Sequence, residues 1–224
     1  KNMSYINNIK KDVDNIIIEK YDGSNLVINE NIELLKIDKN SDTIRVCFLD
    51  LETTGLDAKE DTPIEIAIKI VEFEKNSGKL KNAVAEYESY NDPGVPIDSH
   101  ITKLTGITNE MVSNASIDWS KVKSLLELSQ IAVAHNAKFD RSFIDKYINT
   151  NMVWACSQKD INWMERGFFK ISLEMLCIWH GFYFGAHRAM NDVNATINLL
   201  THSSYKENIP ILELINNAKK PIYR

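Results

Sequence analysis

Two carboxylates stand at the end of an apolar run in CFLDLETTGLD, residues 47–57. Side chains two positions apart in a β-strand point to the same face, so Asp50 and Glu52 are expected to project together. Two carboxylates held this close repel each other, and the pKa of one rises unless a cation neutralises both. The pair therefore indicates a cation site, although an acidic strand end that simply reaches solvent would have the same sequence.

Two further segments place acids near the start of expected helices. Asp140 follows the apolar stretch IAVAH, and Asp192 lies in HRAMND. An acid in this position also has a common structural role, because it complements the positive end of the helix dipole. His187 precedes Asp192 by five positions, which would separate the two side chains by about 140° on an uninterrupted helix. They can meet only if His187 lies in a loop before the helix, and GFYFGA just upstream favours such a loop.

The order of the expected elements predicts an α/β fold with a mixed five-stranded sheet. The segments 43–53, 63–74 and 83–90 predict three antiparallel strands, with a hairpin turn at NSG. IAVAHN and MVWAC predict two further, parallel strands that alternate with helices. Helices are expected in SHITKLTG, TNEMV, SIDWSKVKSLLELS, AKFDRSFIDKYI, SLEMLCIWHG and HRAMNDVNATINLLTHS. The polar site of such a sheet is expected at the ends of its central strands.

Residues 1–42 differ in texture from the rest and are expected to form a small N-terminal extension with a structural or partner-docking role. Apolar residues recur at helical spacing in YINNIKKDVDNIII and predict a helix there. YDGSNLVINENIELLKI predicts a turn followed by one or two short strands. The main domain is expected to span residues 43–203, and residues 204–224 are expected to form a C-terminal tail.

Length and composition limit the classes of function. A chain of 224 residues can hold one ample domain with a sizeable core. Its 31 acids and 26 bases give a net charge of −5, so a nucleic-acid role must rest on a local site. Three cysteines without a CxxC pair fit a reducing compartment. Without a leader-like start or a long apolar run, we expect a cytoplasmic protein that contacts no membrane.

Three motifs resemble those of the DEDDh family of 3′–5′ exonucleases, the group that contains the epsilon subunit of bacterial DNA polymerase III. FLDLETTGL is similar to the first exonuclease motif, HNAKFDRSFI to the second and HRAMNDVNAT to the third. HITKLTGITNEMV also resembles the segment usually found between the first two motifs. The resemblance runs over residues 44–200 and implies a ribonuclease H-like fold.

The resemblance also implies a metal-dependent reaction. The implied ligands of two divalent cations, Mg²⁺ or Mn²⁺, are Asp50, Glu52, Asp140 and Asp192. Two cations about 3.5–4 Å apart can stabilise the attacking and leaving oxygens of a phosphodiester, and oxygen-only ligands suit these ions. His187 is implied as the general base, since a neutral imidazole can accept a proton at pH 7. The implied activity removes nucleoside 5′-monophosphates from a 3′ end, with single-stranded DNA as the favoured substrate.

A second group of residues is expected to contact the last nucleotide of the substrate. Its members are Thr53, Thr54, Gly55, Leu56, Asn136 and Phe139. Backbone N–H groups of the TTGL turn are placed to meet the 3′-hydroxyl, and Leu56 to press on the terminal base, as this apolar position tends to do in the family. An ordinary turn with Leu56 in the core is the alternative, and for Phe139 the alternative is plain core packing. His135 is expected to be a structural hydrogen-bonding residue.

Two rival functions remain open at the level of sequence. A ribonuclease of the same family would trim RNA or short oligonucleotides, because the first motif does not report the 2′-hydroxyl. A binding or assembly module would keep the fold without turnover, but all five expected catalytic positions carry the expected residue types. The N-terminal extension could serve a protein partner in either case.

Overall fold

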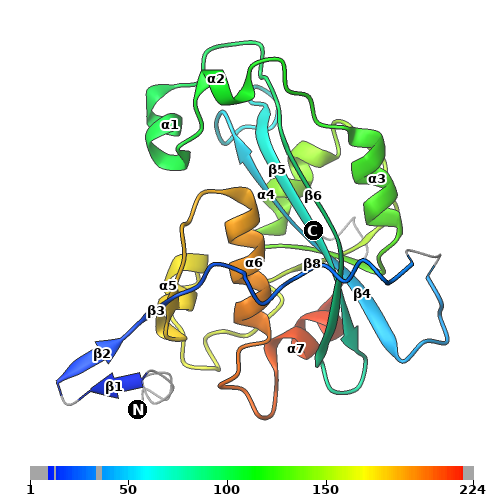
Figure 1. The fold of residues 1–224 in the computed structure, drawn as a ribbon, viewed down its shortest axis with the longest axis vertical. Coiled ribbons are helices and arrows are strands. Elements are labelled where there is room, and N and C mark those ends of the chain that lie inside the picture. Colours follow the sequence, from blue (N-terminus) through cyan, green and yellow to red (C-terminus); the bar gives the residue numbers. More distant parts are fainter. Residues whose placement is uncertain (1–9, 13, 34–36, 219–224) are drawn as a thin grey trace.

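A five-stranded mixed sheet with the strand order β6-β5-β4-β7-β8 forms the centre of the molecule (Figure 1). The computed structural model describes residues 10–12, 14–33 and 37–218. The strands of this sheet are β4 Thr43–Thr53, β5 Pro63–Glu74, β6 Leu80–Tyr90, β7 Ile131–Ala134 and β8 Val153–Cys156. β4, β5 and β6 pair antiparallel, whereas β7 pairs parallel with β4 and β8 parallel with β7. The predicted fold, three antiparallel strands and then two parallel ones, is therefore confirmed.

Helices cover both faces of this sheet (Figure 1). The helices of the described residues are α1 Ser99–Thr105, α2 Asn109–Val112, α3 Trp119–Glu127, α4 Ala137–Ile144, α5 Leu173–Trp179, α6 Ala189–Leu200 and α7 Pro210–Asn217. α3 and α4 pack against one face, and α5, α6 and α7 against the other. All six helices predicted for the main domain are confirmed. Among the described residues, no helix has the length and apolar character needed to cross a membrane.

The packing of β4 explains why its sequence is apolar almost to its end. Val46 and Phe48 belong to the core cluster that contains α6, whereas Cys47 belongs to the cluster that contains α3 and α4. Successive side chains of a strand point to opposite faces, so a strand covered on both faces needs apolar residues at every position. The same alternation places Asp50 and Glu52 on the face of α6.

The described part of the N-terminal segment begins with strands and not with the predicted helix. β1 Lys10–Asp12 pairs antiparallel with β2 Asn15–Ile17, so the helix prediction is wrong for these residues. Residues 1–9 and 13 lie outside the described part of the chain. The run of three isoleucines at 16–18 gives the reason, because β-branched side chains favour strands over helices.

The predicted turn after this hairpin is confirmed. In place of the one or two strands predicted beyond it, the described residues of this stretch form one isolated bridge. The amide of Ser24 donates to the side chain of Asp22 at 2.9 Å. Ile28 forms an isolated parallel bridge with Ala83 of β6. Residues 34–36, which were part of the strand prediction, lie outside the described residues.

The N-terminal segment joins the main core. β3 Glu19–Lys20 pairs parallel with β9 Phe182–Tyr183, and Leu26 is 5% exposed within the core cluster of α6. At the other end of the chain, α7 lies in the segment expected as a tail. Its residues Ile211 and Leu214 are fully buried in the same cluster.

Candidate metal and active site

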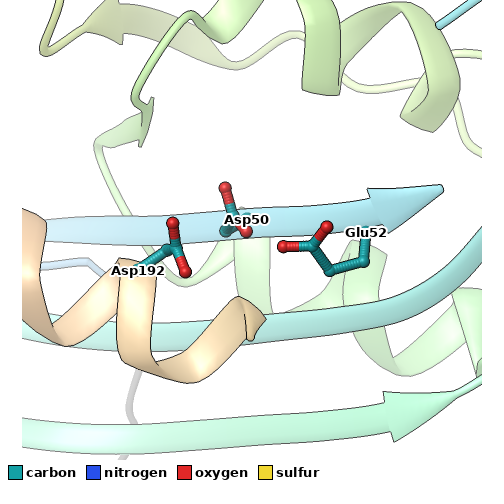
Figure 2. A group of neighbouring side chains, drawn as sticks. All are labelled: Asp50, Glu52 and Asp192. Carbon is teal, nitrogen blue, oxygen red and sulfur yellow. The ribbon is translucent and has the colours of Figure 1, made fainter. Parts of the chain in front are cut away.

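Three carboxylates meet where β4 emerges from the core. Asp50 and Glu52 point from the end of β4 toward Asp192, which lies in the first turn of α6 (Figure 2). Each side chain offers one oxygen, and these oxygens all lie within 4.8 Å of one another. The group follows from the alternation of β4, which turns both of its acids toward the face that α6 covers. The structure thus brings Asp50 and Glu52 together with Asp192 of the third motif.

Asp140 approaches the same strand end from α4. Its side chain is 2% exposed, and Oδ1 accepts a hydrogen bond from the amide of Leu51 at 3.1 Å. Asp140 is not a member of the close group of three oxygens. Its charge nevertheless acts on Asp50 and Glu52, whose pKa values it raises. The fourth predicted ligand therefore lies beside the other three and is held by the backbone of β4.

All four carboxylates have raised pKa values. Burial is the largest cause, and it raises the pKa of Glu52 and of Asp140 to about 8 and that of Asp192 to about 7. The pKa of Asp50 rises well above its usual value through burial and then through repulsion from Asp192 and Asp140. Clustered anionic oxygens with this repulsion fit a hard divalent cation such as Mg²⁺ or Mn²⁺, which would favour the charged form of each group.

His187 lies in the loop directly before α6, as its spacing from Asp192 required. Its φ of 63° is in the left-handed region, which is uncommon for a residue other than glycine. The ring atom Nε2 lies 3.9 Å from Oε2 of Glu174 in α5. The next residue, Arg188, donates its amide to the carboxylate of Asp192 at 3.2 Å. His187 and Asp192 are thus joined through a short, hydrogen-bonded loop–helix junction.

In the TTGL turn the leucine is exposed, and some of the backbone groups form hydrogen bonds within the protein. Leu56 is 86% exposed, so the alternative that placed it in the core is wrong. The hydroxyl of Thr53 donates to the carbonyl of Gly55 at 2.6 Å. The amide of Thr54 donates to the carbonyl of Thr62 at 2.9 Å, so this N–H group is already engaged.

In the second motif, Asn136 has a left-handed backbone conformation and His135 forms hydrogen bonds within the protein. Asn136 has a φ of 71° just before α4 and is exposed, whereas Phe139 is partly buried against the core. The ring nitrogens of His135 lie 2.8 Å from the hydroxyl of Ser157 and 2.8 Å from the carbonyl of Ile171. Burial lowers the pKa of His135 to about 4, so its predicted structural role is supported by its contacts.

Glu65 is a residue at this site that the sequence analysis did not single out. It lies opposite Glu52 in the pairing of β5 with β4 and is 4% exposed. Its carboxylate forms an ion pair with Arg188 at 3.1 Å. An acid at the start of the alternating segment PIEIAIKIVEFE was the available signal, but the register that brings it to Glu52 is not visible in the sequence.

The fold and this carboxylate group define an exonuclease of the ribonuclease H-like superfamily with the DEDDh pattern. The family model RNase_T, described as an exonuclease, matches residues 47–200, and the chain belongs to this family. The predicted family is therefore confirmed.

Curated relatives cover part of this chain and are much longer than it. A DNA polymerase III PolC-type of Caldanaerobacter subterraneus subsp. tengcongensis is 44% identical over 98 residues, which are 42% of this chain and 6% of the relative. The PolC-type polymerase of Bacillus subtilis is 32% identical over 161 residues, which are 67% of this chain and 11% of the relative. The chain thus spans about a tenth or less of the length of these relatives.

Solved exonuclease structures share the fold. Exonuclease X in complex with 5′ overhanging duplex DNA matches with a TM-score of 0.51 and 23% identity, over 75% of this chain and 99% of that one. E. coli exonuclease I in complex with a dA16 oligonucleotide matches with a TM-score of 0.53 and 17% identity, over 75% of this chain and 42% of that one. At these identities the likeness concerns the fold.

Proposed function

We propose that this chain is a 3′–5′ exonuclease that hydrolyses the last phosphodiester bond of DNA and releases nucleoside 5′-monophosphates. The observation that carries the proposal is the group of Asp50, Glu52 and Asp192, whose oxygens lie within 4.8 Å of one another in a chain of the exonuclease family. The 3′–5′ direction is supported by the resemblance of the three motifs to the DEDDh enzymes. DNA is favoured because the similar solved structures include complexes with DNA.

The carboxylates are proposed to bind two divalent cations, Mg²⁺ or Mn²⁺. Asp50, Glu52 and Asp192 supply the close oxygens, and Asp140 supplies a fourth carboxylate beside them. When bound, the cations would supply positive charge to the phosphate that is attacked. The chain itself holds its acids in a fixed arrangement, because Asp140 is tied to the amide of Leu51 and Asp192 to that of Arg188.

His187 is proposed to take the proton from the attacking water through a ring nitrogen. Its loop position beside the first turn of α6 supports this role, as does its partial exposure of 40%. Histidine suits the task because its usual pKa of about 6.5 leaves it able to accept a proton at neutral pH.

The last nucleotide is proposed to lie against the TTGL turn and the start of α4. The exposed side chain of Leu56 is free to press on the terminal base. The proposed contacts are Thr53, Thr54, Gly55, Leu56, Asn136 and Phe139. A turn that encloses the terminal nucleotide would admit a free 3′ end and reject continuous backbone, which gives the proposed exonuclease mode.

The proposed division of the chain keeps the catalytic domain at residues 43–203. A protein partner is proposed for the N-terminal segment, residues 1–42. The exposed isoleucines Ile16 and Ile17 support that proposal, since they are 52% and 42% exposed.

A gel assay with 5′-labelled single-stranded DNA and a matched RNA strand tests the proposal. Each strand is incubated with Mg²⁺, Mn²⁺ or chelator, and Asp50→Asn serves as the inactive control. We expect a ladder of shortened DNA products that requires a cation. Full activity in excess chelator would contradict the metal requirement, and immediate release of a labelled mononucleotide would contradict the direction. Faster degradation of the RNA strand would favour the ribonuclease alternative.

A further inference from the structure

Glu65 lies beside the proposed metal ligands, but both of its carboxylate oxygens accept hydrogen bonds from the start of α6. It lies opposite Glu52 on β5, so both side chains face α6. Among the described residues it is not part of the close group of ligand oxygens. Oε1 accepts from Nη2 of Arg188 at 3.1 Å, and Oε2 accepts from the amide of Ala189 at 3.1 Å. The carboxylate of Glu65 is therefore hydrogen-bonded to Arg188 and Ala189 at the N-terminus of α6.

Arg188 is fixed a second time by the neighbouring strand. Its Nη2 donates to the hydroxyl of Tyr90 at 2.5 Å, and its guanidinium carbon lies 5.7 Å from the centre of the Tyr90 ring. Tyr90 pairs with Glu65 in the register of β5 and β6. β5, through Glu65, and β6, through Tyr90, thus both bind Arg188. The position of these two strands therefore determines the position of the loop that precedes α6.

The start of α6 depends on this contact. Arg188 is the N-cap residue, and its own side chain does not cap the helix. The first amides of a helix lack partners within the helix, and an anion there is favoured by the helix dipole. Glu65 supplies both the acceptor and the charge from another part of the chain. Ala189, whose amide it binds, is fully buried.

Arg188 and Ala189, which Glu65 binds, lie in the chain between the proposed base His187 and the proposed metal ligand Asp192. His187 precedes Arg188 and has a φ of 63°, a conformation that persists only where surrounding contacts hold it. Asp192 accepts from the amide of Arg188 at 3.2 Å. A shift of Arg188 would therefore move the base and a metal ligand together.

We infer that Glu65 is a positioning residue, which acts through Arg188 and Ala189 to hold Asp192 and His187 in register with the acids of β4. The inference rests on the proposed function, because it concerns the cation site and the base of that reaction. Glu65 itself does not bind the cation. Arg188 is a structural link, and its charge pairs with that of Glu65. Loss of Glu65 weakens cation binding and turnover together.

The test compares Glu65→Gln with Glu72→Gln in the full chain. Glu72 lies on the same strand and pairs with Arg45 at 2.9 Å, with side chains 12% and 14% exposed, so it is a matched ion pair away from the site. Mn²⁺ binding is measured by the loss of the free Mn²⁺ signal in electron paramagnetic resonance. We expect Glu65→Gln to weaken Mn²⁺ binding about 10–100-fold, the range seen for residues that orient metal ligands. Glu72→Gln should bind Mn²⁺ as wild type does.

A second variant separates positioning from direct ligation. Arg188→Met removes the arginine link but leaves the Glu65 carboxylate and its hydrogen bond from the amide of Ala189, so it should weaken Mn²⁺ binding, by no more than Glu65→Gln does. The double variant should be little worse than Glu65→Gln alone, because Glu65→Gln already breaks the link to Arg188. Should Arg188→Met bind Mn²⁺ normally while Glu65→Gln does not, Arg188 does not position the cation site and the inference is wrong. If Glu65→Gln fails to fold, Arg188→Met and the milder Tyr90→Phe carry the same comparison.

Turnover at a series of Mn²⁺ concentrations, measured on protein that circular dichroism shows to be folded, gives a second readout. We expect kcat to fall in Glu65→Gln with little change in KM for DNA, and excess Mn²⁺ to restore part of it. Wild-type Mn²⁺ binding and turnover in Glu65→Gln, or an equal defect in Glu72→Gln, would overturn the inference. Wild-type protein that binds Mn²⁺ without exonuclease activity would overturn the proposed function alone, whereas wild-type protein that binds no Mn²⁺ would overturn both.

Discussion

The carboxylates at the end of β4 oppose folding when no cation is bound. Burial raises the pKa of Glu52 and Asp140 to about 8 and that of Asp192 to about 7. A carboxyl group in the unfolded chain titrates near pH 4, so between about pH 4 and 8 the folded state holds more protons than the unfolded state. The free energy of unfolding should therefore decrease as the pH rises through this window in the presence of chelator.

Urea unfolding at pH 6.5 and pH 8 isolates this effect. Burial lowers the pKa of both His135 and His180 to about 4, so each histidine makes the protein more stable as the pH rises toward 6.5 and changes little above it. Asp50→Asn removes one buried carboxylate together with its repulsion of the others, and we expect a higher midpoint and a flatter decrease. Equal slopes for the two proteins would show that the pKa of Asp50 is not raised in the folded state.

Saturating Mg²⁺ or Mn²⁺ should reverse the same instability. A ligand that binds the folded state alone raises the unfolding free energy with its concentration. Wild-type protein should therefore unfold at a higher temperature with Mn²⁺ than with chelator, and Asp192→Asn should show a much smaller shift. A shift of the same size in both proteins would place the cation elsewhere.

His187→Ala tests the base separately from the ligands. A general base acts in the transition state, and its loss lowers the rate by about 10²–10⁴-fold. We expect this loss in kcat with little change in KM. Near-normal turnover would exclude His187 as the base.

At the scale of elements, the turn after β4 presents Leu56 on a constrained loop. Asp61 accepts from the hydroxyl of Thr54 at 3.1 Å and from the amide of Asp57 at 2.9 Å. A Cβ at Gly55 would approach the carboxyl carbon of Asp61 to 2.6 Å, so a glycine is needed where the loop folds over this side chain. The loop therefore holds an exposed leucine at the site without burying it.

Leu56→Ala should change activity and leave stability as it is. The side chain is 86% exposed, so its loss removes almost no core packing. We expect a lower kcat/KM on single-stranded DNA and an unchanged unfolding midpoint. Val27→Ala, at a position that is 76% exposed on the N-terminal segment, is the control and should change neither. Equal activity of Leu56→Ala and wild type would remove Leu56 from the proposed substrate contacts.

The elements differ in how far their sequences determine them. The alternation of β4 was sufficient to predict that Asp50 and Glu52 share a face, because neighbouring residues along one strand decide it. The spacing of His187 from Asp192 was sufficient to predict a loop before α6. Glu65 was not predictable in the same way, since its position opposite Glu52 depends on the pairing of two strands and on the irregularity that follows Glu52.

At the scale of the whole molecule, the N-terminal segment contributes to the same core as the catalytic elements. Lys69 of β5 is 3% exposed, and its Nζ donates to the side chain of Asn194 at 2.7 Å and to the carbonyl of Leu26 at 3.4 Å. A Cβ at Gly23 would clash with Asn194, so the segment lies directly against α6. These contacts join residues far apart in the chain. A change in sequence texture near residue 43 therefore predicted an extension but could not reveal how it packs.

Leu26→Ala should destabilise the whole domain. Leu26 is 5% exposed, and truncation of a buried leucine costs about 2–5 kcal/mol through lost packing and the cavity that remains. A chain that starts at residue 43 should lose more, because it also removes the carbonyl partner of Lys69 and the pairing of β3 with β9. Urea unfolding of wild type, Leu26→Ala and residues 43–224 measures both changes. Val27→Ala, which alters the exposed neighbour, should unfold as wild type does. Were residues 43–224 to keep the wild-type unfolding free energy, the N-terminal segment would not contribute to the stability of the domain.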